Sequence, residues 1–442
     1  MNPTIKLNLK FLKEISWPVV ILIFIQFFGW VTAKQAFILY IFLIVGIIGF
    51  MKKIIFPKIG GIKFYLFFIM FSSIIGLILY ETRNVFRDLY YVLPAVALMI
   101  LGYYLNIIQA EKVSLLKTMV FCGTIIALDS IFNCLRNISI LTSFEEMRGN
   151  FDVGVYHVLC SFVIIFAALF TDIGIKMFKK WINYLCFALM LIQLVLCLSR
   201  SVWVGAILGC VVVLLLEQYL QPNVVNAAKK IATLLAILIL GAILFFSIAP
   251  ESVVDEFLDK FDKTTEELDS QQEFSSIGET MNNWRGYENQ CAKRQWQKAT
   301  VAEEIFGQGM GSGIYLEYVP YTWKAMVEDN KIPLLHNGYY TILIKGGVIG
   351  IGALIWLMLG NVFLGFKLLK KRQDIKGELI IMIALEIIYL VLTAVVRGAV
   401  TQNINIVWTL LIGWISADIS RKQKNLNNHF SVGKIKTGEE FI

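Results

Sequence analysis

The stretch IATLLAILILGAILFFSIA at residues 231–249 decides the fold class of this chain. It contains no charged residue, and as a helix it would be about 28 Å long. That length nearly matches a bilayer core of roughly 30 Å. Similar apolar runs recur along the chain, without the alternation of polar and apolar residues that is typical of barrel strands. The sequence therefore predicts an all-α membrane protein.

The composition agrees with this prediction. The chain has 442 residues, of which 57% are hydrophobic and 16% charged, and its mean hydropathy is +0.70. These values exclude an ordinary soluble domain and a disordered chain. We predict about 12 transmembrane helices, which places both termini on one side of the membrane. The predicted spans are residues 17–33, 36–51, 62–80, 89–106, 118–135, 155–175, 182–198, 201–216, 231–249, 348–366, 379–396 and 402–419. The first is interpreted as an uncleaved helix rather than a secretory signal, because it is long and another span follows at once.

One large external loop is predicted between spans 9 and 10. It covers residues 250–335 and holds 16 acidic and 8 basic residues. The chain then divides into spans 1–9 at residues 1–249, this loop, a re-entry helix with spans 10–12 at residues 336–420, and a cytoplasmic tail at residues 421–442.

Three local patterns stand out inside the loop. A helix is expected at its start, because apolar residues recur there with helical spacing. It could lie along the membrane surface or over the bundle mouth, and the alternative is a solvated acidic helix that only packs against the protein. A second helix is predicted over residues 285–306. The following GQGMGSG at residues 307–313 is interpreted as a flexible turn, because it lacks the Lys-Ser/Thr of a phosphate-binding loop. The apolar stripe of the first helix is Val254, Phe257, Leu258 and Phe261, and the aromatic group after the turn is Tyr315, Tyr318, Tyr321 and Trp323.

The basic residues orient the chain and reveal an anomaly. One predicted face carries 24 of them, 22 being lysines, so this face is cytoplasmic. Short external loops normally lack basic residues, yet most arginines fall on the external side. A set of guanidiniums kept there suggests an anion, and the likeliest external anion is a lipid-linked phosphate. The eight external arginines are Arg83, Arg87, Arg136, Arg148, Arg200, Arg285, Arg294 and Arg397.

Arg200 lies in LSRSVW at residues 198–203, between two spans with almost no loop. Placing arginine at membrane depth costs roughly 2.5–3.5 kcal/mol, so this residue needs a partner or a function. Anion binding is one interpretation. The other is a structural arginine that caps helix-end carbonyls or pairs with Asp129 or Asp152.

A second segment, HNGYYTILIKGGVIG at residues 336–350, returns the loop to the membrane. Only His336 and His157 are predicted near the outer face. A neutral imidazole there can take a proton from a sugar hydroxyl near pH 7. A lone histidine is also often structural, so the residue type alone leaves both roles open.

Taken together, these segments resemble the O-antigen ligase and polymerase family. The resemblance rests on SRSVW, a long loop with WRGYE at residues 284–288 and a Gly-rich turn, and the His-Asn re-entry, and it covers roughly residues 180–370. It implies a glycosyltransferase whose donor is a polyprenyl-diphosphate-linked glycan. It further implies that Arg200 and Arg285 hold the diphosphate and that His336 activates the acceptor hydroxyl. Arg294 could fill the role of Arg285. The sequence departs from the family pattern in two places. Ser201-Val202 stands where small residues are usual before the Trp, and the long loop is unusually acidic.

The chemistry of a diphosphate leaving group fits paired arginines. Charge-assisted bonds to the developing negative charge are worth about 1.5–3 kcal/mol each. The first external loop offers only Lys34 and Gln35, without an acidic pair to hold a metal, so we predict a metal-independent transfer with no cofactor. The cysteines show no zinc spacing. The net charge of +8 reflects the cytoplasmic lysines, so nucleic-acid binding is not inferred.

The other charged residues near the predicted outer mouth have open roles. Arg83 and Arg87 flank a short loop and could form local ion pairs, each worth little at a surface. Ionisable residues inside spans are functional candidates by default, although structural pairing is the first interpretation here. The possible acceptor-contacting or mouth residues are Arg83, Arg87, Arg148, Asp129 and Arg397, and Glu386 is a further ionisable residue within a span.

The sequence therefore predicts a bacterial cytoplasmic-membrane enzyme with its active site on the outer face. We favour polymerisation of lipid-linked repeat units into a surface polysaccharide. An alternative is an O-antigen ligase that transfers glycan to a lipid A core, and another class is a transporter or flippase of an anionic lipid-linked substrate. The expected partners are the polyprenyl-diphosphate-linked oligosaccharide, the bilayer, and a chain-length regulator and flippase.

Overall fold

The computed structural model describes residues 9–109, 113–268, 274, 276–319, 327, 329–396 and 408–421. Of the residues that the structure describes, 80% are helical. In the described part, eight helices are long and apolar enough to cross a membrane, or nine if a bent pair counts as one span. The helices agree with the prediction of an all-α membrane protein, whereas the number of twelve spans stays a prediction.

Each of the first nine predicted spans contains a helix. These helices are α1 Trp17–Phe27, α2 Ala33–Met51, α3 Ile62–Leu79, α4 Thr82–Gln109, α5 Leu115–Arg136, α7 Val155–Phe170, α8 Lys180–Leu196, α9 Arg200–Leu220 and α10 Val224–Ile248. The short helices of this part are η1 Leu9–Glu14, η2 Ile138–Thr142 and α6 Phe144–Phe151, of which α6 is bent by 62° against α7.

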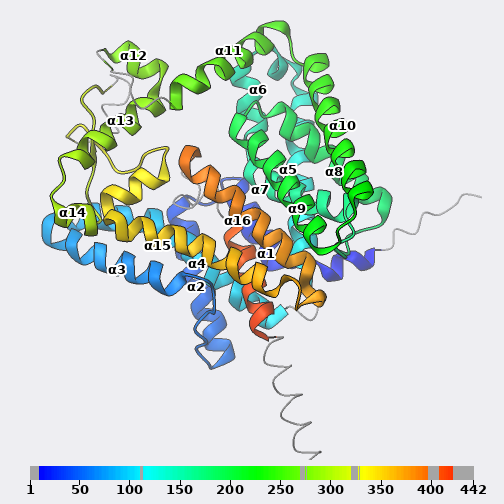
Figure 1. The fold of residues 1–442 in the computed structure, drawn as a ribbon, viewed down its shortest axis with the longest axis horizontal. Coiled ribbons are helices and arrows are strands. Elements are labelled where there is room, and N and C mark those ends of the chain that lie inside the picture. The colour runs from blue at the N-terminus through cyan, green and yellow to red at the C-terminus, as the bar shows by residue number, and fades with distance from the viewer. Residues whose placement is uncertain are drawn as a thin grey trace, which may run out of the picture.

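The remainder of the chain supplies the loop and the last helices. The loop contains α11 Glu251–Leu268, α12 Ile277–Asn282, α13 Trp284–Gln297, α14 Val301–Phe306 and the antiparallel strands β1 Ile314–Tyr315 and β2 Lys331–Ile332. After it come α15 Gly338–Leu369, η4 Gln373–Ile375, α16 Lys376–Val396 and helical residues 408–421. In Figure 1, α11, α12 and α13 lie along the top, above α3, α15 and α16.

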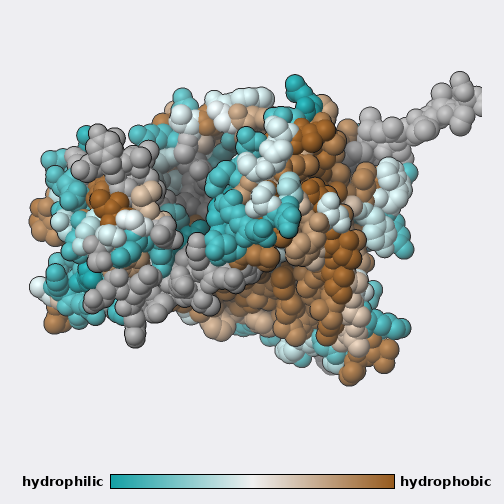
Figure 2. Space-filling view, turned by 90° about the horizontal axis from the view of Figure 1, so that it is seen from above, coloured by the Kyte–Doolittle hydropathy of each residue, from teal (hydrophilic) through white to brown (hydrophobic). Residues whose placement is uncertain are grey.

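The membrane part is a packed bundle with an apolar outside. α15 contacts α16 and α3, α16 contacts α9, and α7 contacts α5 and α8. By contrast, only 17% of the apolar window of α10 is buried. Such an exposed apolar surface is stable against lipid rather than water. Figure 2 shows polar residues gathered over the loop face and apolar residues on one flank.

A break in α15 decides how the loop enters the membrane. Gly347 has φ 61° and ψ −159°, which interrupts the helix, and the predicted span at residues 348–366 begins directly after it. A break frees carbonyls that would otherwise accept intrahelical hydrogen bonds. The carbonyl of Ile344 instead accepts from Gln308 N at 2.8 Å, and that of Lys345 from Gly309 N at 3.0 Å.

The Gly-rich segment at residues 307–313 is therefore not the flexible turn that was expected. Most of it is buried between α3, α4 and α15. Gly309 has φ +90°, and a Cβ on Gly76 of α3 would lie 1.9 Å from the carbonyl oxygen of Met310. Only glycine at position 76 permits the Met310 backbone to come this close, and only glycine readily adopts the positive φ of Gly309. The segment fastens the loop to the bundle.

A buried ion pair reinforces the same junction. Lys345 of α15 and Asp88 of α4 are both almost completely inaccessible, and the ammonium contacts the carboxylate. Lys345 also donates to the Ser312 carbonyl at 2.6 Å, and Asp88 accepts from Gly311 N at 2.6 Å. Charges buried this deeply are tolerated when they are paired and hydrogen-bonded.

Two predictions for the loop helices need adjustment. The helix expected at the start of the loop exists as α11. It buries Val253 and Phe257, whereas Leu258 of the predicted apolar stripe is 47% exposed. The helix predicted over residues 285–306 is wrong, because α13 and α14 are separate. Thr300 and Glu303 form a capping box that starts α14 anew. Of the predicted aromatic group, Tyr321 and Trp323 lie outside the described residues.

Candidate active site

His336 lies where the loop re-enters the bundle, directly before α15. Asn337 caps that helix, and its side chain accepts from the backbone N–H groups of Tyr339 and Tyr340 at 3.0 and 3.2 Å. The Thr341 hydroxyl accepts from Leu335 N at 3.0 Å. These bonds fix the turn around His336 on both sides, and its side chain remains 33% exposed.

Glu288 of α13 holds the His336 ring. Its Oε2 accepts from the His336 backbone N–H at 2.8 Å and lies 2.9 Å from Nδ1. Its Oε1 accepts from the Trp284 indole N–H at 2.7 Å. The Glu288 side chain is only 2% exposed, so its carboxylate is oriented by protein groups on both oxygens.

This arrangement selects one tautomer of the imidazole. A carboxylate can only accept hydrogen bonds, so Nδ1 carries the proton and Nε2 is left with its lone pair. A histidine oriented in this way can take a proton through Nε2, while the carboxylate stabilises the resulting imidazolium. The pair has the geometry of a general base and its orienting partner.

Arg200 begins α9 after a tight turn at residues 197–199. Leu198 adopts a left-handed φ of 51°, which is unfavourable for a branched residue and marks a constrained turn. The Trp203 indole N–H donates to the Leu194 carbonyl at 2.7 Å, which joins the end of α8 to the start of α9. The Arg200 guanidinium donates to the Lys260 carbonyl of α11.

Arg285 stands on the same helix as Glu288. Its charge acts electrostatically on the Tyr156 hydroxyl of α7, and this hydroxyl lies 3.5 Å from the hydroxyl of Ser201, the residue after Arg200. Arg285 precedes Glu288 by three residues on α13, a rise of about 4.5 Å along one helix face. Tyr156 therefore lies near both Arg285 and the start of α9, and Glu288 joins α13 to His336.

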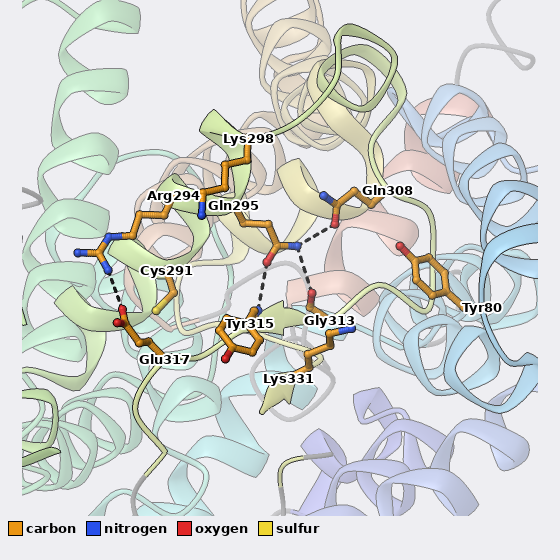
Figure 3. A pocket seen from close by; sticks show the side chains of 10 residues that line it. All are labelled: Tyr80, Cys291, Arg294, Gln295, Lys298, Gln308, Gly313, Tyr315, Glu317 and Lys331. Atoms are coloured by element: carbon orange, nitrogen blue, oxygen red, sulfur yellow. Dashed lines mark hydrogen bonds and ion pairs between the residues drawn. The ribbon is translucent and has the colours of Figure 1, made fainter. Parts of the chain in front are cut away.

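Arg294 lies elsewhere. Nine residues separate it from Arg285, which turns the helix by about 180° at 100° per residue. Its guanidinium pairs with Glu317 at 2.9 Å. It lines a pocket of about 580 Å³ between α13, the strands and the end of α3, shown in Figure 3. The structure therefore does not bring Arg294 together with Arg285.

The remaining predicted residues are dispersed. Arg87 pairs with Asp88 at 3.3 Å, Arg83 is exposed, and Asp129 accepts from the Asn133 amide at 3.2 Å. Arg148 lies within electrostatic reach of Asp152 and of Cys197 beside the Arg200 turn.

Two further residues were named from the sequence, Glu386 and Arg397. Glu386 is buried and accepts from the Asn361 amide at 2.8 Å. Arg397 lies outside the described residues.

Sequence reasoning missed Glu288, Tyr156 and Ser201. Glu288 stands in the quoted WRGYE motif, but only its contact with His336, 48 residues away, reveals a role. Tyr156 directly precedes His157, which is buried and forms no part of this site.

Comparison with known proteins adds no family. No family model matches the sequence, and a search of curated proteins finds no match. Among the described residues, no group of three or more His, Cys, Asp or Glu side chains is placed to hold a metal ion.

Proposed function

We propose that this chain is a membrane glycosyltransferase that polymerises lipid-diphosphate-linked oligosaccharide units into a surface polysaccharide. The observation that supports it most directly is the Glu288–His336 pair, in which a buried carboxylate orients an imidazole and Arg285 stands about one helical turn before Glu288 on α13. A base beside a guanidinium is what glycosyl transfer from a diphosphate donor requires.

The proposal includes a topology. Twelve spans cross the bacterial cytoplasmic membrane, with the lysine-rich face inside and residues 250–335 outside. Eleven of the predicted spans contain helical residues of α1–α5, α7–α10, α15 and α16, and the helical residues 408–421 overlap the twelfth at residues 408–419. In this orientation His336 faces the outside of the cytoplasmic membrane, where the proposed polymerisation takes place.

The proposed reaction has one chemical step. The acceptor hydroxyl gives its proton to Nε2 of His336 as its oxygen forms a bond to the anomeric carbon of the donor. The bond from that carbon to the diphosphate oxygen breaks, and the diphosphate leaves with the electron pair. Glu288 stabilises the imidazolium that results.

The two arginines serve the leaving group. A guanidinium binds phosphate oxygens through two parallel N–H bonds, and negative charge grows on these oxygens as the bond breaks. Arg200 and Arg285 arrive from different helices, α9 and α13, so the loop must be docked on the bundle for both to act.

The test is turnover by the purified protein with a polyprenyl-diphosphate oligosaccharide as the sole substrate. Polymer should form with wild type and fail with His336→Ala, whereas Arg136→Ala, an exposed arginine at the end of α5, should be unaffected. Undiminished polymer with His336→Ala would refute the mechanism. Transfer only to an added lipid A core would identify a ligase, and movement of the lipid without a new bond would identify a transporter.

A further inference from the structure

The pocket that contains Arg294 lies on the face of α13 turned away from Arg285. Its volume is about 580 Å³, within the range of roughly 300–1,000 Å³ that small-molecule sites occupy. The walls come from α13, the Gly-rich segment, both strands and Tyr80 at the end of α3. Its lining residues are Tyr80, Cys291, Arg294, Gln295, Lys298, Gln308, Gly313, Tyr315, Glu317 and Lys331.

The pocket concentrates positive charge in an acidic loop. Residues 250–335 hold 16 acidic and only 8 basic residues, yet three of the eight are Arg294, Lys298 and Lys331. Glu317 neutralises Arg294 at 2.9 Å. Among the described residues, no ion pair is recorded for Lys298 or Lys331, whose side chains are exposed. A local excess of cations in an anionic domain attracts an anionic ligand.

The other lining groups suit a saccharide. The Gln295 amide donates to the Gln308 side chain at 2.7 Å and to the Gly313 carbonyl at 3.2 Å, and its oxygen accepts from Tyr315 N at 3.1 Å. Figure 3 shows Gln295 in the middle of the pocket with Lys298 above it and Lys331 below. Both N–H groups of Gln295 are engaged within the protein, so the Gln308 amide nitrogen and the Tyr80 and Tyr315 side chains are the groups that offer hydrogen bonds and flat apolar faces to a sugar.

The remaining lining groups add donors rather than negative charge. Burial raises the pKa of the Tyr80 hydroxyl, with smaller contributions from Glu303 and Asp88. Burial likewise raises the pKa of the Cys291 thiol. Both groups are therefore neutral at physiological pH, and among the described lining residues Glu317, already engaged by Arg294, is the only carboxylate.

We propose that this pocket binds a carboxylate-bearing saccharide segment of the glycan that the enzyme handles. The role rests on the proposed function, whereas the binding itself requires no turnover. A sugar carboxylate is favoured over the donor diphosphate. The two lysines, Lys298 and Lys331, lie on opposite sides of Gln295, so each can contact one single charge, and they do not converge on one group. A diphosphate is held better by converging guanidiniums.

Direct binding to the full-length protein in nanodiscs tests the inference. The probes are trigalacturonate and its fully methyl-esterified form, titrated by calorimetry at low salt because exposed charges are screened. Wild type should bind the acid and not the ester. Lys298→Gln with Lys331→Gln should weaken this binding about 10- to 100-fold, a loss of about 1.4 kcal/mol for each factor of ten.

The control is Lys293→Gln, which removes a charge from the same helix outside the pocket lining and should bind like wild type. Equal binding of acid and ester, or wild-type affinity in the double variant, overturns the proposal. Stronger competition by inorganic pyrophosphate than by galacturonate overturns the sugar assignment. Because His336→Ala should retain trigalacturonate binding while losing polymerisation, failure of this site and failure of the proposed function are distinguishable.

Discussion

Glu288 and His336 are joined twice, since one carboxylate oxygen contacts both the backbone N–H and the ring Nδ1 of the histidine at 2.8 and 2.9 Å. This double contact fixes the position of the residue as well as the orientation of its ring. The carboxylate and the histidine come from two elements of the loop, α13 and the turn before α15.

Replacing Glu288 with Gln should disrupt the orientation of His336. The Trp284 indole donates to one carboxylate oxygen and the His336 backbone to the other, and an amide can accept on only one of these atoms and carries no charge to stabilise the imidazolium. The turnover number should fall about 100-fold or more, and raising the pH should not restore it. Steady-state rates against pH measure this, with Glu304→Gln on the exposed face of α14 as control. An unchanged turnover number would exclude the base-orienting role.

Arg200→Lys and Arg285→Lys should each reduce turnover although the charge is kept. An ammonium cannot reproduce the two parallel bonds of a guanidinium, and one lost charge-assisted bond of about 1.5–3 kcal/mol corresponds to roughly 10- to 150-fold. Arg136→Lys provides the matched control. Wild-type rates in both variants would show that charge alone suffices.

Gly347→Ala should destabilise the protein. The residue has φ +61°, and a Cβ would lie 2.4 Å from the Ile305 carbonyl oxygen, so a loss of about 1–3 kcal/mol is expected. The control on the same helix is Gly352→Ala, where a Cβ meets nothing within 4 Å. This variant should gain about 0.5–1 kcal/mol. Thermal unfolding in detergent compares the two, and equal midpoints would contradict the strained break.

Lys345→Met should be more harmful than loss of the whole ion pair. It removes the buried cation and leaves Asp88 with the partly exposed Arg87 at 3.3 Å, and removing one partner of a buried pair costs about 3–5 kcal/mol. Adding Asp88→Asn should recover much of that loss, because the amide oxygen can still accept from Gly311 N. A double variant no more stable than Lys345→Met would refute the pairing argument.

Chelation should leave glycosyl transfer intact, because the proposed step assigns the leaving group to guanidiniums. The measurement is polymer yield with and without EDTA, followed by addition of Mg²⁺ or Mn²⁺. Activity that disappears with EDTA and returns with either ion would overturn the metal-independent prediction.

The helices could be predicted because the signal for them is local. An apolar run such as residues 231–249 has one stable conformation in a bilayer, since its backbone polar groups must be satisfied within the segment. The break at Gly347 falls directly before the predicted span at residues 348–366, and the pair Gly346 and Gly347 is a local signal for it. Helical geometry alone separates Arg285 from Arg294, since nine residues turn a helix by about half a revolution.

Contacts between distant segments could not be predicted in this way. Nothing in WRGYE distinguishes Glu288 from a solvated glutamate until the loop brings it to His336. The Gly-rich segment looks flexible by composition, and its partners, the carbonyls of Ile344 and Lys345, are available only because α15 breaks at Gly347.

The break at Gly347 also divides α15 into a short part next to His336 and a long apolar part. Helices tilt to match the thickness of the membrane around them, and a continuous α15 would carry His336 along with any such tilt. Residues 338–346 are instead fastened to the Gly-rich segment and, through Lys345, to Asp88 of α4. A change of tilt in the rest of α15 that bends the helix at Gly347 would therefore leave His336 and Glu288 in place, and the geometry of the proposed active site would not depend on lipid composition.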